Sequence, residues 1–289
     1  MTSDIAIAGG GIAGLTAALL LSRAGFKVTV FERSGSFSEV GAGLQISPNA
    51  GRILDNLGLG AALDAVATRP TAIEMRGVQS GRTIVALPLA LAAQRHGAPY
   101  RLLHRADLQA ILVEAAEADP AITIEAGADV ALIGEDADGV RITAGGTERR
   151  FDVLIGADGV RSRIRALVGG GPAEPTGRTA WRITIPAGEA PATIARDRVT
   201  VFLGDRQHVV IYPVRAGKEI NVVAIIEEGW RGEGWSEPGD ARHLAQHFRG
   251  AADDLAALIA TGSAWTRWCL SGVDARGPWQ RGRVALIGD

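Results

Sequence analysis

Three glycines near the start of the chain have the spacing of a turn that binds phosphate. Gly9, Gly11 and Gly14 form the pattern G-x-G-x-x-G, which follows an apolar run and opens a stretch rich in Ala and Leu. The first glycine allows a sharp turn, the second leaves room for a pyrophosphate, and the third lets a helix pack closely on a strand. The N–H groups and dipole of that helix, which begins with Ile12 and Ala13, attract an anion. The pattern therefore predicts a dinucleotide site.

A carboxylate that follows the glycines in the sequence indicates which dinucleotides can bind. The β-type run K-V-T-V-F at 27–31 ends at Glu32, which is followed by Arg33. An acidic residue at this position can accept hydrogen bonds from both ribose hydroxyls of an adenosine, and its charge repels a 2′-phosphate. We therefore expect FAD or NAD, and not NADP, at this site. The alternative is an ordinary glycine-rich turn.

Two histidines stand at a spacing that is used in metal sites. His243 and His247 stand four residues apart, as metal ligands on a helix do, but Leu244 occupies the place where a zinc-protease motif requires Glu. We therefore interpret the pair as a solvated helix face and expect no metal in this protein. The single cysteine, Cys269, is given no catalytic role.

Composition limits the class of protein. The chain has 289 residues, of which 47% are apolar, so it can bury a substantial core in one large domain or two. A net charge of −2 gives no reason to expect a nucleic-acid partner. The uncharged run 5–22 contains four glycines and follows Asp4 instead of basic residues, which argues against a membrane span. A lone cysteine suits a reducing compartment, so we expect a soluble, cytoplasmic protein.

The order of predicted elements indicates an α/β protein with a Rossmann-like domain and a mainly antiparallel β-sheet domain. The segments 5–8, 151–159 and 282–289 each contain an apolar run too continuous to alternate, which is typical of buried parallel strands. Predicted helices cover 12–24, a segment ending at Leu57, and 104–118, with Ser162 capping a further short helix. We expect the remaining elements of this part to be strands near 72–76 and 83–86, an irregular stretch at 88–99, and a meander of strands at 122–125, 130–133 and 140–143.

The second half of the chain has a different composition, because all six tryptophans lie at or after Trp181. Four runs separated by short turns predict successive strands at 179–185, 199–203, 207–214 and 219–226. Helices at 238–248 and 253–259 and a strand at 265–270 are predicted to follow. This part should form the antiparallel sheet domain.

Seven motifs follow one another along the chain in a specific order. They are G-x-G-x-x-G, G-A-G-L-Q-I-S-P-N-A (41–50), H-R-A-D-L (104–108), D-V-L-I-G-A-D-G-V-R-S (152–162), A-W-R (180–182), Y-P-V-R (212–215) and G-R-V-A-L-I-G-D (282–289). In this order they resemble the single-component FAD-dependent aromatic hydroxylases, and most closely the branch of salicylate hydroxylase, 3-hydroxybenzoate 6-hydroxylase and 6-hydroxynicotinate 3-monooxygenase. The resemblance implies residues 1–70 and 100–172 in an FAD-binding domain, an excursion at 71–99 into a substrate domain at 173–278, and a last FAD-binding strand at 279–289.

The resemblance also implies which residues contact the cofactors. In such enzymes Arg105 would contact the FAD phosphate and ribityl region, Asp158 would touch both FAD and the passing NAD(P)H, and Asp289 would hold the ribityl hydroxyls. The segment 41–45 would lie near the isoalloxazine. An alternative for Arg105 is a solvated arginine at a helix start. The predicted cofactor contacts are Gly9, Gly11, Ile12, Ala13, Gly14, Glu32, Arg33, Gly43, Gln45, Arg105, Asp158, Gly159, Arg161, Gly288 and Asp289.

The chemistry implied by the resemblance is hydroxylation of an aromatic ring. NAD(P)H reduces FAD, O2 is captured as a flavin C4a-hydroperoxide, and a small phenolic or hydroxylated N-heteroaromatic acid is hydroxylated, as in the catabolism of aromatic compounds. The expected partners are the aromatic substrate, NADH or NADPH, and O2, in a monomer or homodimer. Two alternatives remain: an FAD-dependent reductase or dehydrogenase without oxygen transfer, and a catalytically incomplete nucleotide-binding fragment.

A histidine and a tyrosine are the candidates for substrate activation. In a strand His208, Val210 and Tyr212 point to one face, so both polar groups can line the same surface. Removal of the phenolic proton by a base pushes electron density into the ring. The resembling 6-hydroxynicotinate enzyme uses His and Tyr at this spacing. The alternative is a histidine on the outer face of an edge strand.

The sequence stops at Gly288-Asp289, the last two residues of the last motif. In the resembling enzymes a further segment follows, and its helix faces the flavin. We therefore expect a C-terminally truncated chain that folds its Rossmann part, binds FAD weakly and does not hydroxylate.

Overall fold

The chain forms two compact units in the computed structural model, which describes residues 3–37, 42–232 and 234–289. Unit 1 comprises Met1–Glu39, Leu108–Glu174 and Ser271–Asp289, and unit 2 comprises Val40–Asp107 and Pro175–Leu270. This division differs from the predicted one, which assigned 40–70 and 100–107 to the FAD-binding domain. The reason lies in strand pairing, because residues 43–46 pair with 101–104, and both segments belong to unit 2.

Unit 1 is built on a six-stranded sheet in the order β18-β19-β11-β1-β2-β7. Its strands are β1 (Asp4–Ala8), β2 (Lys27–Glu32), β7 (Ile122–Ala126), β11 (Val153–Gly156), β18 (Gln280–Arg281) and β19 (Val284–Leu286). Neighbours run parallel, apart from the antiparallel pair of β18 and β19. The three buried parallel strands predicted from continuous apolar runs are confirmed, and with them the Rossmann-like part of the predicted fold.

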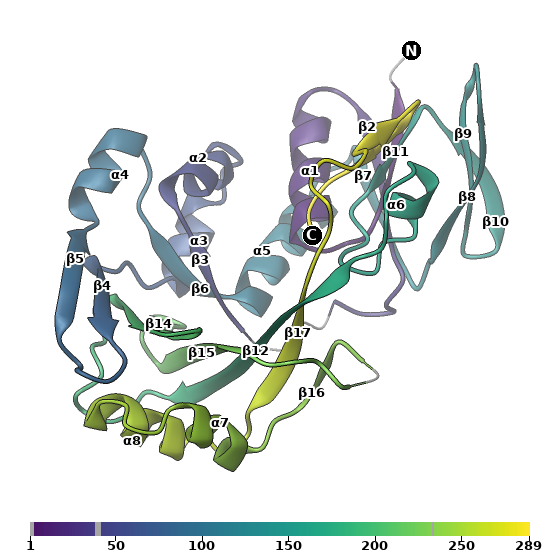
Figure 1. The fold of residues 1–289 in the computed structure, drawn as a ribbon. Helices are drawn as coiled ribbons and strands as arrows, with labels where there is room; N and C mark the ends of the chain where they lie inside the picture. Colours follow the sequence, from purple (N-terminus) through teal and green to yellow (C-terminus); the bar gives the residue numbers. More distant parts are fainter. Residues whose placement is uncertain (1–2, 38–41, 233) are drawn as a thin grey trace. The chain divides into compact units, whose positions relative to one another are not determined.

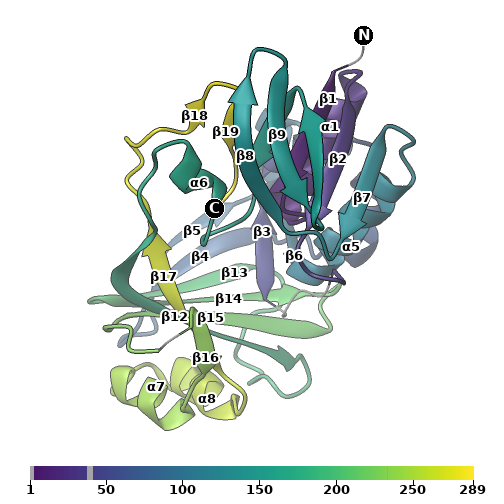
Figure 2. The ribbon, with the colours of Figure 1, turned by 90° about the vertical axis from the view of Figure 1, so that its right-hand side faces the viewer.

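Two layers cover this sheet because side chains of a strand alternate between its faces. Ala6 and Ala8 of β1 share a core with Val140 and Ile142 of a three-stranded sheet, formed by β8 (Val130–Asp136), β9 (Gly139–Ala144) and β10 (Thr147–Phe151). Helix α1 (Ile12–Arg23) lies on the other side (Figure 1, Figure 2). The predicted meander was wrong in one strand: β7 pairs in parallel with β2, and β10 completes the meander.

Unit 2 is built on an eight-stranded sheet in the order β16-β17-β12-β15-β14-β13-β4-β5. Its strands are β4 (Ala72–Gly77), β5 (Thr83–Pro88), β12 (Glu174–Pro186), β13 (Val199–Gly204), β14 (Gln207–Val214), β15 (Glu219–Glu227), β16 (Ser236–Pro238) and β17 (Thr266–Gly272). The four successive strands predicted in the second half are confirmed as β12 to β15. The pairs among them are antiparallel, whereas β4 and β13 run parallel.

The two faces of the unit 2 sheet are covered differently. Helices α7 (Ala241–His247) and α8 (Asp253–Thr261) pack on one face, where Trp181 and Phe202 are fully buried with Leu244 and Leu258 (Figure 1). On the other face Tyr212 packs against Leu102 of β6 (Arg101–His104), which pairs with β3 (Gly43–Ile46). The helices not yet named are α2 (Pro48–Asn56), α3 (Gly60–Val66), α4 (Ala90–His96), α5 (Arg105–Glu117) and α6 (Ile164–Leu167).

Helix α4 corrects one prediction, because the segment 88–99 was expected to be irregular. Its sequence A-L-A-A-Q-R-H consists largely of strong helix formers. The helix ends at Gly97, whose φ of 75° is the left-handed conformation common after helix ends. The flanking prolines, Pro88 and Pro99, obscured this short helix in the sequence.

No helix in the described part of the chain is long and apolar enough to cross a membrane. The uncharged run 5–22 is divided between β1, the glycine turn and α1.

Candidate cofactor and substrate sites

The three glycines of the turn between β1 and α1 have different roles. A Cβ on Gly9, whose φ is 113°, would collide with the carbonyl oxygen of Ala157. A Cβ on Gly14 would collide with the carbonyl oxygen of Gly9, so the fold itself requires both residues. A Cβ on Gly11 would meet nothing within 4 Å, and its φ of −75° suits any residue. Packing therefore does not require a glycine at position 11. The missing side chain instead leaves open space at the start of α1.

The start of α1 has the properties of an anion site. Gly11 is the N-cap and offers no side-chain hydrogen bond, and the first turn contains no acidic residue. The first N–H groups of a helix have no partner inside the helix, and its N-terminus carries partial positive charge. A phosphate in the space in front of Gly11 would satisfy these donors. The residues present therefore fit the pyrophosphate of a dinucleotide.

Glu32, at the end of β2, holds the middle of the glycine turn. Its Oε2 accepts a hydrogen bond from the Gly10 N–H at 2.8 Å, and its Oε1 accepts one from the Ser34 N–H at 2.9 Å. From another side, the buried Gln109 donates to the Gly10 carbonyl oxygen at 3.3 Å. Sequence reasoning missed Gln109, although it directly follows the H-R-A-D-L motif. Each Glu32 oxygen keeps a lone pair that a ribose hydroxyl could use.

Asp158 has a clear structural role at the end of β11. Its carboxylate accepts hydrogen bonds from the Ser162 hydroxyl at 2.5 Å, the Arg163 N–H at 2.7 Å and the Ile164 N–H at 3.2 Å. Ser162 in turn accepts from the Arg165 N–H at 2.9 Å. The two side chains thus satisfy the first N–H groups of α6, as predicted for Ser162 alone. A contact between Asp158 and a cofactor remains a prediction.

The last motif, residues 282–289, ends next to the start of α1. Gly288 has a φ of 77°, and a Cβ there would lie 2.9 Å from the Cβ of Ala13 in the first turn of α1. A larger residue would therefore press on the helix start. Unit 1 thus brings together the glycine turn, Glu32, Gly288 and the backbone of Asp158, which borders Gly9. Of the other predicted contacts in this unit, Arg33, Arg161 and Asp289 are exposed.

The remaining predicted cofactor residues belong to unit 2. The Gly43 N–H donates to Asn221 Oδ1 at 2.6 Å, and a Cβ on Gly43 would lie 2.6 Å from the Tyr212 ring. Gln45 Oε1 accepts from the Tyr100 hydroxyl at 2.8 Å. The Arg105 N–H donates to the Ala42 carbonyl oxygen at 2.9 Å. Gly41, the first residue of this motif, lies outside the described residues.

Strand register gathers polar side chains on the face of the unit 2 sheet opposite α7 and α8. Tyr212 pairs with Asn221, which pairs with Thr184, and Arg182 lies two residues from Thr184 on the same face. His208 lies on this face too, as the spacing predicted, because Val209 and Ile211 point into the opposite core. We call these five residues the polar sheet face: Arg182, Thr184, His208, Tyr212 and Asn221. Strand β14 is interior, so the alternative of an edge-strand histidine is wrong.

The two candidate acid–base groups have different protonation behaviour. Burial, reinforced by the positive charge of Arg178, lowers the pKa of His208, so its imidazole is neutral at pH 7 and can accept a proton. Burial raises the pKa of Tyr212, which is 3% exposed, so its hydroxyl keeps its proton and can donate a hydrogen bond. The polar sheet face therefore offers one base and one donor.

Three other atoms of the polar sheet face suggest that a polar ligand binds there. Arg182 Nε, Thr184 Oγ1 and Asn221 Nδ2 are buried and have no hydrogen-bond partner among the described residues. An unpaired buried polar atom costs about 1–3 kcal/mol, so three together on one face are unusual. The guanidinium of Arg182 also stacks on the Trp268 ring, 5.4 Å from its centroid. The A-W-R motif alone predicts no contact for Arg182.

Comparison with known proteins gives consistent matches over the whole chain. Residues 2–289 match the family model described as FAD binding domain. The chain is 38% identical over 288 residues to 3-amino-4-hydroxybenzoate 2-monooxygenase PtnB3 of Streptomyces platensis, covering 99% of this chain and 72% of that protein. It is 31% identical over 291 residues to 6-hydroxynicotinate 3-monooxygenase of Bordetella bronchiseptica, covering 99% and 75%. A solved salicylate hydroxylase substrate complex matches with a TM-score of 0.83 at 26% identity, covering 99% and 72%.

Proposed function

This chain belongs to the FAD binding domain family and is an FAD-dependent monooxygenase, and from this premise we propose that it hydroxylates a small phenolic or hydroxylated N-heteroaromatic acid with NADH or NADPH as reductant. The resemblance drawn from the motifs is confirmed, and so is FAD as the cofactor. The names of both relatives describe a ring that carries a hydroxyl and a carboxylate. This shared chemistry supports a substrate of the same class.

FAD would supply the redox chemistry that side chains lack, since it accepts a hydride from NAD(P)H and, once reduced, activates O2 for transfer to a ring. In unit 1 the glycine turn would hold its pyrophosphate, Glu32 the adenosine ribose, and Asp289 the ribityl hydroxyls. Arg105, Gly43 and Gln45 are the contacts proposed from unit 2. The route of oxygen transfer expected from the resemblance is part of this proposal.

His208 would activate the substrate by taking the proton of its ring hydroxyl at an imidazole nitrogen. A positioned base of this kind contributes about 10²–10⁴-fold to a reaction rate. Tyr212 would donate a hydrogen bond to the same ring, because it keeps its proton. Four strand residues span about 13 Å, so the two side chains can contact opposite ends of one small ring.

Arg182 would bind the carboxylate of the substrate. Its guanidinium lies on the face that carries His208 and Tyr212, and its Nε has no partner among the described residues. A planar fork of donors matches a carboxylate in two parallel hydrogen bonds. The single observation that carries the proposed function is this combination, on one sheet face, of a neutral base, a protonated tyrosine and a guanidinium.

The test measures oxygen transfer directly. The purified protein with added FAD and NADH would be supplied with 3-amino-4-hydroxybenzoate, 3-hydroxybenzoate or 6-hydroxynicotinate under 18O2, with unsubstituted benzoate as the control. We expect at least one hydroxylated acid to accelerate NADH oxidation and to gain one 18O atom. Accelerated NADH oxidation without 18O in the product, for every hydroxylated acid, would instead identify a reductase.

A further inference from the structure

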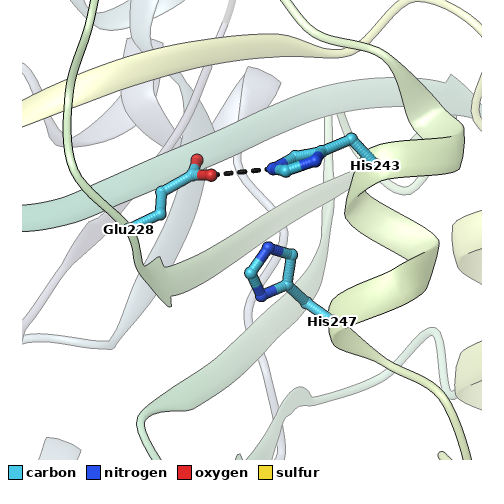
Figure 3. A group of neighbouring side chains, drawn as sticks. All are labelled: Glu228, His243 and His247. Carbon is cyan, nitrogen blue, oxygen red and sulfur yellow. Dashed lines mark hydrogen bonds and ion pairs between the residues drawn. The ribbon is translucent and has the colours of Figure 1, made fainter.

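A second cluster of functional groups lies on the helix-covered side of the unit 2 sheet, away from the polar sheet face. His243 and His247 project from one side of α7, and Glu228 directly follows β15 (Figure 3). One ligand atom from each residue lies within 4.8 Å of the corresponding atoms of the other two. His243 Nε2 is 2.9 Å from Glu228 Oε2, and the two imidazole rings are 5.0 Å apart between centroids.

The carboxylate of this cluster is held in a fixed orientation. The indole N–H of Trp181 donates to Glu228 Oε1 at 2.9 Å, which leaves Oε2 facing the histidines. Metal-binding side chains are commonly oriented by outer hydrogen bonds of this kind.

Arg267 and Trp181 border the carboxylate and the imidazole of His243. Arg267 lies 3.9 Å from Glu228 Oε1, but its guanidinium is also paired with Glu237. The ring of Trp181 stacks on His243 with centroids 5.7 Å apart and restricts the motion of that imidazole. The Glu228 side chain is 11% exposed and that of His243 is 45% exposed, so an ion can reach a largely preformed site from solvent.

We propose that Glu228, His243 and His247 form a binding site for a divalent transition-metal ion of the zinc class. Imidazoles at i and i+4 of a helix together with a carboxylate supply three of the four ligands of a tetrahedral zinc ion, and water can supply the fourth. Imidazole ligands favour zinc, copper and nickel over magnesium and calcium, which prefer all-oxygen sites. The ion would replace the direct His243–Glu228 hydrogen bond and fasten α7 to the end of β15.

This proposal reverses the expectation drawn from the sequence, which saw a solvated helix face because Leu244 stands where a zinc-protease motif has Glu. That motif needs its Glu as a catalytic base and not as a metal ligand. Here the third ligand comes from Glu228, on a different element. The site is independent of the proposed hydroxylation, since its residues lie on the opposite face of the sheet from His208 and Arg182.

The experiment titrates Zn²⁺ into chelator-treated protein against a chromophoric chelator. We expect one equivalent to bind and to raise the melting temperature. His247→Ala, His243→Ala and Glu228→Gln should each weaken binding by at least the 10–100-fold typical of lost outer-sphere partners. His96→Ala is the matched control, since His96 is an exposed histidine at the end of another helix, and it should bind Zn²⁺ as the wild type does.

Two further measurements keep the test independent of folding defects. Glu228→Gln retains an oxygen for the Trp181 N–H, and far-UV circular dichroism checks each variant. Co²⁺ added to the wild type should give visible absorption bands of a tetrahedral nitrogen and oxygen site, and His247→Ala should lack them. The proposal is overturned if Zn²⁺ binding is not saturable at one equivalent. It is equally overturned if folded His247→Ala and Glu228→Gln bind Zn²⁺ with wild-type affinity.

Discussion

The glycine turn of unit 1 and the polar sheet face of unit 2 are built in opposite ways. The glycine turn is a contiguous segment that acts through backbone atoms, and two of its three glycines are required by packing alone. The polar sheet face consists of side chains from β12, β14 and β15 that strand register places together. A site made of backbone in one segment can be predicted from spacing, whereas a site made by register needs the strand pairing first.

The largest expected effect tests whether Gly11 serves the ligand and not the fold. Gly11→Val should abolish FAD binding, because its side chain would fill the space where the pyrophosphate should lie. It should leave the melting temperature nearly unchanged, since a Cβ there meets no protein atom within 4 Å. FAD fluorescence titration and thermal unfolding measure the two effects. Wild-type FAD affinity in this variant would contradict the assignment of the turn.

Two matched glycines sharpen that comparison. Gly14→Ala should lower the free energy of unfolding by about 1–3 kcal/mol, the usual cost of overpacking, because its Cβ collides with the Gly9 carbonyl. Gly188→Val, at an exposed position with no atom within 4 Å of its Cβ, should change neither property. If Gly14→Ala were as stable as the wild type, it would be wrong to distinguish glycines that packing requires, Gly9 and Gly14, from the glycine that the ligand requires, Gly11.

The next effect concerns the base on the polar sheet face. His208→Ala should lower the rate of hydroxylation by about 10²–10⁴-fold and leave reduction of bound FAD by NADH largely intact. The variant should therefore consume NADH and release hydrogen peroxide with little product. Tyr212→Phe should cause a smaller loss, because it removes a donor and not the base. Normal coupling in His208→Ala would exclude His208 from substrate activation.

The sequence predicted most strands of both units but not all of their pairings. Continuous apolar runs identified the parallel strands, and the glycine spacing located the turn, because both signals are local. The pairing of β7 with β2 was missed, since nothing in residues 122–126 states which strand they join. Helix α4 was missed because prolines flank a segment of only seven residues.

The same distinction explains which site residues were found. His208 and Tyr212 were predicted to share a face because they occupy one strand, where the period of two is certain. Asn221 and Thr184 became visible only through their register with Tyr212. Glu228 was likewise missed as a neighbour of His243, since a turn and a strand separate them in the sequence. Contacts between distant segments are the part that spacing cannot supply.

A smaller effect is expected at Glu32, where one side chain serves both ligand and fold. Glu32→Ala should weaken FAD binding by about 10–100-fold, the equivalent of one hydrogen bond to a charged group. It should also lower the free energy of unfolding by about 1–2 kcal/mol, because the Gly10 N–H loses its acceptor. Calorimetric FAD titration and thermal unfolding separate the two. Unchanged FAD affinity would remove Glu32 from the ribose.

The smallest expected effect is a shift in pH dependence caused by a residue outside the polar sheet face. A base must be neutral to act, so hydroxylation should fall as pH decreases through the pKa of His208, which burial and Arg178 hold below its ordinary value of 6.5. The Arg178 charge disfavours protonation of the imidazole, and Arg178→Gln should therefore raise this pKa and move the acid limb of kcat/KM to higher pH. Because Arg178 is exposed and screened by salt, the shift should be less than about one pH unit and should shrink as ionic strength rises.

Arg206→Gln, which removes another exposed arginine from the turn before β14, should leave the acid limb of kcat/KM in place. If Arg178→Gln moved the limb to lower pH, or if the limb persisted in His208→Ala, the titrating base would be a group other than His208.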